Sequence, residues 1–290
     1  MKFRFINQEQ RWYGVDALCR AMGVTRGGYW SWLQRKPSAR DHANTVLLSE
    51  IRKVHKAKRR VYGSPRMHDH LRKAGISGGR NRIARLMREN EIRAKQGKKF
   101  KPTTTDSKHS LPVADNILKR RFTWAQPNQA WVADITYIPT KEGWLYLATV
   151  MDLFARRIVG WAMGDRVDRH LALRALRMAI QRRQPPKGLI HHSDRGSQYA
   201  SGDYQRELEK HGIVCSMSRK GNCWDNAPME SWYRTLKVEL FEEEAFATRR
   251  QATAAIFEYM EVFYDRQRLH TAIGGFTPAE FEELHLCRAA

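Results

Sequence analysis

The change in hydrophobic pattern near residue 126 constrains the fold of this 290-residue chain more than any other feature. Beyond it come short runs rich in β-branched and aromatic residues, three of them joined by tight turns, which predicts an antiparallel meander. Helical and strand-like segments then alternate, so the expected order is βββαβαβα, an α/β fold with a five-stranded mixed sheet and flanking helices. The predicted strands are 130–140, 144–154, 156–164, 188–194 and 213–218, and the predicted helices are 171–183, 204–212 and 225–240.

The charge of the chain is divided unevenly at the same point. Residues 1–125 hold 30 Lys and Arg against 9 Asp and Glu, whereas residues 126–290 hold 22 against 21. A soluble protein does not need to gather its excess positive charge in one half. The division therefore favours binding of a polyanion, with nucleic acid ahead of a merely solvated basic face, joined to a separate activity.

Two stretches of the basic half have the pattern of helix-turn-helix units. In the first, a helix is followed by a turn at Gly23 and a second helix that starts with Thr25 as its cap. In the second, Gly75 lies in the turn and Ser77 is the expected cap. In such units the second helix enters the major groove of DNA, and two in tandem are stronger evidence than one.

The basic half also supplies most of the candidate DNA contacts. The run between the two units is rich in Lys and Arg, which suits contact with phosphates, and the stretch after them has the Lys, Thr, Ser and Pro content of a linker. The candidate contacts here are Arg26, Arg59, Arg60, Arg80 and Arg82. The expected domains are a helix-turn-helix at 1–45, a second basic helix-turn-helix-like segment at 46–100, a linker at 101–125 and a core at 126–290 with a C-terminal helix. That helix, residues 248–270, is amphipathic, and we expect it to pack on the core rather than bind a partner.

Three carboxylates in the second half are candidate catalytic residues. Asp134 lies within a predicted central strand, Asp194 follows the fourth strand, and Glu230 lies in the first turn of the last helix. Each has an ordinary alternative: Asp134 faces solvent by alternation, Asp194 forms a turn, and Glu230 complements the helix dipole. Taken together behind a DNA-binding half, they are what a two-metal phosphodiester site requires, because Mg²⁺ prefers oxygen ligands.

Other polar and aromatic residues have weaker claims. Asp152 is expected to pair with Arg156 or Arg157, and the absence of a second pair at ligand spacing argues against zinc at His191 and His192. Candidates for positioning DNA beside the acids are Ser197, Gln198, Asn226 and Arg234. The tryptophans expected in the core rather than as platforms for base stacking are Trp131, Trp144, Trp161 and Trp232.

Specific motifs in the chain resemble a known family. The motifs are WVADITYI, MDLFARRIVGW, HHSDRGSQY, WDNAPMESWYRTLKVEL and YDRQRLHTAIGGFTPAEF. They are similar to those of the orfB-type transposases of the bacterial "IS-three" insertion sequences, whose core is like that of retroviral integrases and has the ribonuclease-H-like fold. The 35 residues between Asp194 and Glu230, and Lys237 seven residues after Glu230, match the spacing of this family.

The resemblance implies a DNA transposase. Asp134, Asp194 and Glu230 would then be catalytic residues that hold two Mg²⁺ ions, for which Mn²⁺ can substitute, and Lys237 would contact DNA. The implied reaction is cleavage at the ends of the element and transfer of a 3′-hydroxyl by transesterification. The rivals are a helix-turn-helix regulator with a degenerate core and a non-specific nuclease, but an intact triad argues against the first and tandem DNA-binding units against the second.

The same resemblance gives the expected partners. They are double-stranded DNA, as terminal inverted repeats and as target, and further copies of the chain assembled on that DNA. In this family the active enzyme is often a frameshift fusion with an upstream-frame orfA segment, and no sustained heptad run is present here. The chain has no run of apolar residues long enough for a membrane span and no CxxC pair, so we expect no membrane partner and a cytoplasmic, nucleoid-associated protein.

Overall fold

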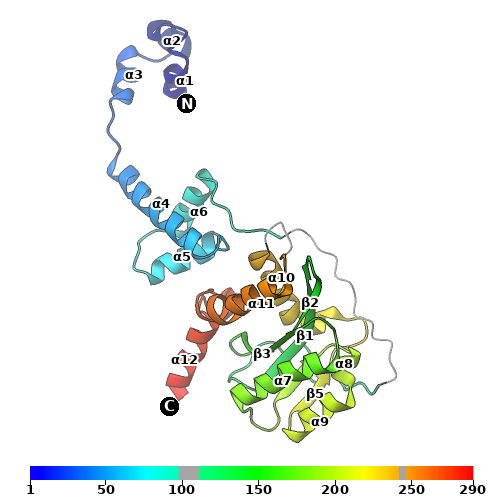
Figure 1. Ribbon diagram of the computed structural model, residues 1–290. Coiled ribbons are helices and arrows are strands. Elements are labelled where there is room, and N and C mark those ends of the chain that lie inside the picture. Colours follow the sequence, from blue (N-terminus) through cyan, green and yellow to red (C-terminus); the bar gives the residue numbers. More distant parts are fainter. Residues whose placement is uncertain (98–110, 242–245, 290) are drawn as a thin grey trace. The chain divides into compact units, whose positions relative to one another are not determined.

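The structure, a computed structural model, describes residues 1–97, 111–241 and 246–289. It divides into two compact units, Met1–Arg52 and Lys53–Ala290. Each unit has its own buried core, and the division falls inside one long helix, α4 (Ala39–Ala57). Figure 1 gives the order of the elements along the chain.

The first unit contains the helix-turn-helix expected from the sequence. After α1 (Lys2–Glu9), helix α2 (Val15–Met22) ends at Gly23, whose φ of 61° lies in the left-handed region that glycine adopts without strain. Thr25 caps α3 (Arg26–Leu33), and its side chain accepts the N–H of Gly28 at 3.1 Å. The predicted turn and the predicted cap are both confirmed.

A second helix pair follows α4, in the larger unit. Helix α5 (Ser64–Lys73) and helix α6 (Arg80–Glu89) pack together through Met67, Leu71 and Ile83, all fully buried. Gly75 lies in the turn with φ 73°, as predicted. Ser77 is not the cap of α6, because the helix begins later and its N-cap is Gly79 without a side-chain bond. The turn is longer than the sequence pattern indicated.

The five strands form the predicted mixed sheet in the order β3-β2-β1-β4-β5. β1 is central, pairs antiparallel with β2 and parallel with β4, and β2 pairs antiparallel with β3. The meander and the central position of the first strand are therefore confirmed. The strands are β1 (Ala130–Thr140), β2 (Gly143–Asp152), β3 (Arg157–Gly164), β4 (Ile190–Ser193) and β5 (Val214–Met217).

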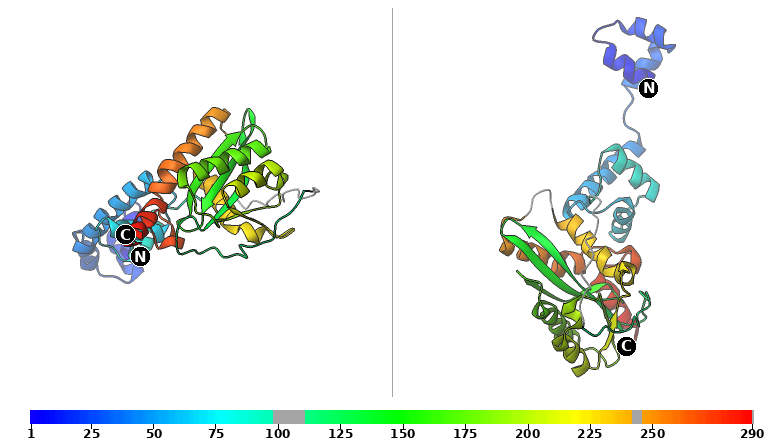
Figure 2. Two further views of the ribbon diagram at one scale, coloured as in Figure 1. Left: turned by 90° about the horizontal axis from the view of Figure 1, so that it is seen from below. Right: turned by 90° about the vertical axis from the view of Figure 1, so that its right-hand side faces the viewer.

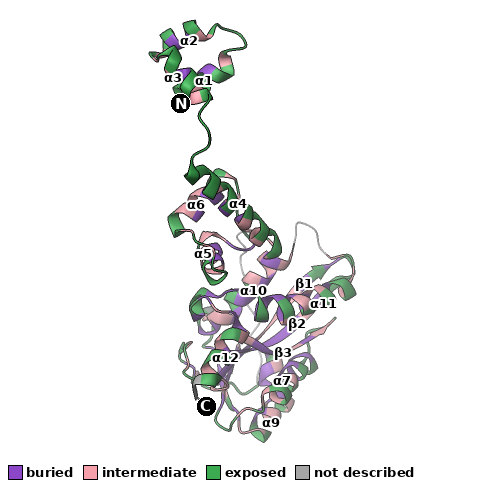
Figure 3. Ribbon diagram, turned by 90° about the vertical axis from the view of Figure 1, so that its left-hand side faces the viewer, coloured by how far each residue is buried: buried purple, intermediate pink, exposed green. Residues whose placement is uncertain are grey.

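Helices cover the sheet on both faces (Figure 2). Helix α7 (Arg169–Arg183) packs on β2 and β3, and with α8 (Ser197–Ala200) and α9 (Gly202–Lys210) it buries one apolar cluster. Trp131 and Ala133 of β1 lie in that cluster, whereas α10 (Ala227–Leu240) packs on β1 from the other face. Figure 3 shows the buried residues gathered along the strands and the inner sides of the helices.

The C-terminal part packs as a helical layer. Helix α11 (Arg249–Glu258) continues into a π-helical turn, η2 (Tyr259–Tyr264), and α12 (Pro278–Ala289) follows after η3 (Thr271–Ile273). The π turn buries most of its side chains, so the predicted packing of this segment on the core is confirmed. None of the helices in the described part of the chain is long and apolar enough to cross a membrane.

The stretch before β1 is attached to the sheet. Residues 101–110 of the predicted linker lie outside the described residues, but Leu118 is buried and the N–H groups of Ile117 and Leu118 donate to Ser216 Oγ at 2.9 and 3.2 Å.

The predicted core positions hold for three of the four tryptophans, which are buried or half-buried. Trp144 is 47% exposed at the β1–β2 turn, so its assignment to the core was wrong.

At Gly160 the backbone of β3 lies close to that of α7, which yields a prediction on stability. A Cβ atom there would lie 2.2 Å from the carbonyl oxygen of Ala175 and 2.7 Å from the backbone nitrogen of Ala179. Neither backbone atom can rotate away, so Gly160→Ala should lower the free energy of unfolding by about 2 kcal/mol, as for overpacked cores. Urea unfolding measures the decrease.

The matched control is Gly164→Ala on the same strand. Its Cβ would meet side-chain atoms of Arg174 and Leu171 at 3.4 Å, and both can shift. This variant should stay within about 0.5 kcal/mol of the parent. Equal midpoints for the two variants would show that α7 does not lie against Gly160 as described.

Candidate active site

Asp134 lies near the middle of the central strand, on the face that α10 covers. Its partner across the antiparallel ladder is Thr149 of β2, and the Thr149 hydroxyl bonds to Tyr233 of α10 at 2.7 Å. Paired residues of a ladder share one face of a sheet, so Asp134 faces α10 while Trp131 and Ala133 face α7. The alternative that Asp134 simply points to bulk solvent does not hold, because the residue is half-buried beneath this helix.

Asp194 follows β4 at the neighbouring position. The parallel pairing of β1 with β4 ends at Val132 opposite His192, and each aspartate lies two residues beyond that pair. Neighbouring strands are about 4.8 Å apart, so the register brings the two backbones together at one edge. Asp194 Oδ1 accepts the N–H of Gly196 at 2.9 Å, so Asp194 also forms the turn that was its alternative role.

Two side chains beside Glu230 fasten its helix to β1. The Asn226 amide donates to the carbonyl oxygen of Ala133 at 3.1 Å, and the Tyr233 hydroxyl donates to that of Asp134 at 2.5 Å. Because the Tyr233 proton is used there, the Thr149 hydroxyl donates to Tyr233. Glu230 lies between these two attachment points, in the first turn of α10. The two bonds therefore fix the position of its backbone along β1, beside Asp134.

The electrostatics agree with this convergence. Burial, followed by the negative charges of Asp194 and Glu230, raises the pKa of Asp134 well above its usual value, while Lys237 acts in the opposite sense. Burial lowers the pKa of Lys237, and Asp134 partly offsets that effect. The Lys237 ammonium also lies 4.8 Å from the ring centre of Tyr137, a cation–π distance.

The donor set fits a hard divalent cation. Asp134, Asp194 and Glu230 offer only oxygen atoms, and the ionised form of Asp134 is disfavoured in its surroundings. Within residues 1–97, 111–241 and 246–289, no three potential ligands lie close enough together to hold an ion directly.

Asp225 fixes the loop in front of α10. It is fully buried and accepts from Arg219 at 2.8 Å, from Arg120 at 2.8 Å and from Asn116 at 2.8 Å. These charge-assisted bonds, led by that of Arg219, hold the pKa of Asp225 far below its usual value. The side chain therefore anchors the start of the Glu230 helix to residues 116–120 and to the loop at Arg219.

The predicted DNA contacts divide into two groups. Arg26, Arg60, Arg80 and Arg234 are exposed, and Arg26 pairs with Asp16 at 3.2 Å. Arg82 is half-buried, and Asn226 is buried with its amide on β1. Arg59 pairs with Glu258 and lies over the ring of Phe263, so its guanidinium is packed against the helical layer.

The two histidines considered as zinc ligands are structural. His192 accepts the Ser216 hydroxyl on Nδ1 and donates to Ser218 from Nε2, and burial lowers its pKa to about 4. His191 bonds to the Tyr204 hydroxyl at 3.0 Å, and burial lowers its pKa to about 3. Both imidazoles belong to the core.

Asp152 is buried, but its predicted partners were wrong. It accepts the N–H groups of Asn128 and Phe154, and its arginine neighbour is Arg183 at 3.6 Å. Arg157 pairs instead with Asp265 and Glu282, because its side chain points to the C-terminal helical layer.

Sequence reasoning missed Tyr233 and Asp225 as residues of the site. One signal was present for Tyr233: three residues after Glu230, it lies on the same side of a helix. In the sequence Asp225 has only the pattern of a helix-start residue, and its two arginine partners are six and 105 residues away.

Comparison with known proteins gives three matching families. An integrase core domain family matches residues 125–223, a second integrase core domain family matches residues 230–286, and an HTH-like domain family matches residues 41–100. The two core matches contain all three candidate carboxylates. The HTH-like match contains α5 and α6 and most of α4.

Relatives of nearly the same length are similar throughout. The chain is 48% identical over 273 residues to the "Insertion element IS600 uncharacterized 31 kDa protein" of Shigella sonnei, covering 94% of this chain and 100% of that protein. It is 41% identical over 292 residues to "Transposase InsF for insertion sequence IS3A" of Escherichia coli (strain K12), covering 99% and 100%. A solved HTLV-2 integrase catalytic core domain in complex with magnesium is 15% identical, with a TM-score of 0.41, over 54% of this chain and 97% of that one.

The Asp225 cluster yields a prediction that depends on pH. Asp225→Asn should lower the free energy of unfolding by about 2 kcal/mol at pH 7, because charge-assisted bonds to a buried carboxylate are removed. The folded pKa lies below the unfolded value of 3.8, so the contribution is fully present above that value and declines as pH falls toward the folded pKa. Denaturant unfolding from pH 7 to pH 3 measures both.

The control for this series is Asp203→Asn. Asp203 pairs with Arg206 and Arg169 at the surface, where such pairs contribute below about 1 kcal/mol. A stability difference for Asp225→Asn that stayed constant down to pH 3 would contradict the assigned pKa direction.

Proposed function

This chain belongs to the IS3 family of insertion-sequence transposases, and we propose that it cleaves DNA at the ends of its element and joins them to target DNA through Asp134, Asp194 and Glu230. The matches to integrase core and HTH-like families make it a DNA-binding polynucleotidyl transferase. The observation that supports this assignment is that Asp194, at the end of β4, and Glu230, on α10, both lie within electrostatic reach of Asp134 on β1.

The three carboxylates would hold the divalent cations that an integrase-type core uses. We propose two Mg²⁺ ions, with Mn²⁺ as a substitute. When bound, such ions lower the pKa of an attacking hydroxyl and stabilise the leaving oxygen during in-line displacement. Hard oxygen donors and the disfavoured lone charge on Asp134 support this choice.

The other side chains would bind and orient the DNA. The ammonium of the half-buried Lys237 would neutralise a phosphate beside the acids. Arg234, which is exposed and lies three residues before Lys237 on the same helix, would contact the DNA backbone. Tyr233 and Asn226 keep Glu230 level with Asp134 by their bonds to β1. Their role is to position, since a misplacement of about 1 Å is enough to reduce catalysis.

The division of labour along the chain follows the charge. We propose helix-turn-helix segments at 1–45 and 46–100 that bind the terminal inverted repeats through Arg26, Arg60, Arg80 and Arg82, a connecting segment at 101–125, and a catalytic core at 126–290. The protein would act on the bacterial nucleoid as a homo-oligomer on DNA. It would also act with the upstream-frame orfA protein or as a frameshift fusion with it.

The first functional prediction concerns the carboxylates. Asp134→Asn, Asp194→Asn and Glu230→Gln should each abolish cleavage and strand transfer in Mg²⁺, because an amide replaces a negative oxygen ligand poorly. Binding to duplexes that carry the terminal repeats should be unchanged or slightly stronger, because repulsion of phosphates falls. Gel shift and strand-transfer assays on the same preparations measure the two properties.

Glu209→Gln, an exposed residue of α9, is the matched control and should retain both activities. Lys237→Ala should weaken placement of the DNA, with only a partial reduction of the chemistry. Strand transfer at the parent level by any one of the three carboxylate variants would end the two-metal assignment, because that mechanism needs all three acids as ligands.

The second functional prediction concerns the basic half. Arg26→Gln and Arg80→Gln in the full chain should each weaken binding to terminal-repeat duplexes. Each should also reduce the slope of log K against log salt by about 0.9 for every phosphate that the variant no longer neutralises. Arg177→Gln, on the far side of the sheet and paired with Glu207, should leave the slope unchanged. An unaltered slope in both test variants would mean that the helix-turn-helix segments do not carry the affinity.

A further inference from the structure

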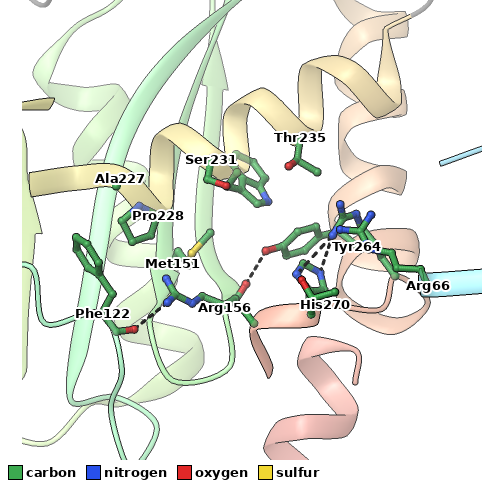
Figure 4. Close-up of a pocket in the computed structure, with 14 residues that line it drawn as sticks. Arg66, Phe122, Met151, Arg156, Ala227, Pro228, Ser231, Thr235, Tyr264 and His270 are labelled. Carbon is green, nitrogen blue, oxygen red and sulfur yellow. Dashed lines mark hydrogen bonds between the residues drawn. The ribbon is translucent and has the colours of Figure 1, made fainter. Parts of the chain in front are cut away.

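A cavity of about 340 Å³ lies along α10 on a different flank from the candidate acids. Figure 4 shows its walls: Pro228, Ser231 and Thr235 come from α10, Phe122 from the stretch before β1, Arg156 from the β2–β3 turn, and Tyr264 and His270 from the C-terminal layer. Side chains on consecutive residues of a helix project about 100° apart. Ser231, which lines the cavity, therefore projects from a different side of α10 than its neighbour Glu230, and none of the three candidate carboxylates lines the cavity.

Arginines dominate the charge of this cavity. Arg66, Arg156 and Arg268 all line it. The Arg156 guanidinium donates to the carbonyl oxygen of Phe122 at 2.8 Å, and among the described residues no carboxylate forms an ion pair with it. Its backbone has a φ of 60°, uncommon for a residue other than glycine, and its own carbonyl oxygen accepts the Tyr264 hydroxyl at 2.9 Å. The turn is thus held so that this guanidinium faces the cavity.

The other two arginines share one acid. Arg268 makes a two-pronged pair with Glu239, with contacts of 2.6 and 2.7 Å, and Arg66 lies 3.8 Å from the same carboxylate. Three guanidinium groups and one carboxylate leave an excess of two positive charges. His270 adds none, because burial and the neighbouring arginines lower its pKa well below the usual value.

The wall also carries neutral donors. Ser231, Thr235 and Thr271 place hydroxyl groups around the arginines, and Ser231 and Thr271 are exposed at the mouth. Guanidinium groups combined with hydroxyls are the donors that bind phosphate oxygens most strongly. The volume is several times that of a water molecule, at about 30 Å³ each, so a phosphate group fits with its remaining hydration.

We propose that this cavity, the arginine pocket, binds a phosphate group of the DNA backbone other than the one that reacts. The proposal rests on the proposed function, since the occupant is the DNA substrate. Its wall is the helix that carries Glu230 and Lys237, so a phosphate held there fixes the path of the strand relative to the acids. The open mouth at Ser231 and Thr271 suits a group that enters as part of a chain. The pocket also counters the negative field of the three carboxylates.

Binding of the full-length protein to a terminal-repeat duplex, in EDTA and across a KCl series, tests this inference. Ser231→Leu fills the mouth without a change of charge, and Arg66→Gln removes one pocket cation. Each should weaken binding at 0.1 M KCl by about tenfold, the worth of a charged hydrogen bond. Ser231→Leu should reduce the salt slope by about 0.9, one phosphate contact. Arg206→Gln, a surface arginine paired with Asp203, is the charge-matched control and should behave like the parent.

A second measurement uses inorganic phosphate as the probe. Phosphate should raise the Tm of the parent protein above that in chloride at equal ionic strength, and Ser231→Leu should abolish this increase. If Ser231→Leu does not fold, Thr271→Leu blocks the opposite side of the mouth and serves the same purpose.

The inference is overturned if the variants that block the mouth bind duplex with the parent's slope of log K against log salt. This holds even if Arg66→Gln binds more weakly, because Arg66 would then act only as surface charge. It is also overturned if phosphate does not raise Tm. Both measurements omit the catalytic metal, so a failure of the strand-transfer assay leaves them unaffected, and their failure leaves the assignment of the three acids intact.

Discussion

The bond from the Tyr233 hydroxyl to the carbonyl oxygen of Asp134 is the contact on which the site depends. Three carboxylates drawn together repel one another, so the scaffold has to hold their backbones against that force. Tyr233 does so from the inside of α10, and Asn226 repeats the link one carbonyl earlier on the same strand. Both bonds use backbone oxygens of the central strand, where the ladder on either side leaves little freedom to move.

Positively charged side chains surround this acidic centre at three places along α10. Lys237 is nearest, and its ammonium lies near the acids, 4.8 Å from the ring centre of Tyr137. Asp225 ties Arg120 and Arg219 to the start of the helix, where their charge is already neutralised in part. The arginine pocket holds an excess of charge on the next flank. A polyanion approaching α10 therefore meets attraction on two sides of the helix and repulsion only at the acids.

Features of the fold that depend on neighbouring residues could be predicted from the sequence, whereas contacts between residues far apart in the chain could not. The alternation in β1, the left-handed glycine at Gly23 and the cap at Thr25 are set by neighbouring residues, and the structure contains each of them. One error was local, because Gly79 rather than Ser77 is the N-cap of α6. The others concerned contacts with remote segments. Asp152 is met by Arg183 rather than by its sequence neighbours, and Trp144 is left exposed because the hairpin carries it past the edge of the core. The triad positions came from spacing and family motifs, whereas the hydroxyl that aligns them depends on a helix–strand contact that no local pattern encodes.

The attachment of residues 116–120 to Asp225 has a consequence for how the chain can be divided. Asn116 and Arg120 supply two of the donors on that buried carboxylate, and the adjoining N–H groups occupy the Ser216 hydroxyl. A shortened protein that lacked this stretch would leave the buried carboxylate of Asp225, at the start of the Glu230 helix, without two of its hydrogen-bond donors. The smallest piece able to keep that helix in place therefore begins upstream of Asn116, and a boundary chosen from the edge of the sheet would remove part of the support of the site.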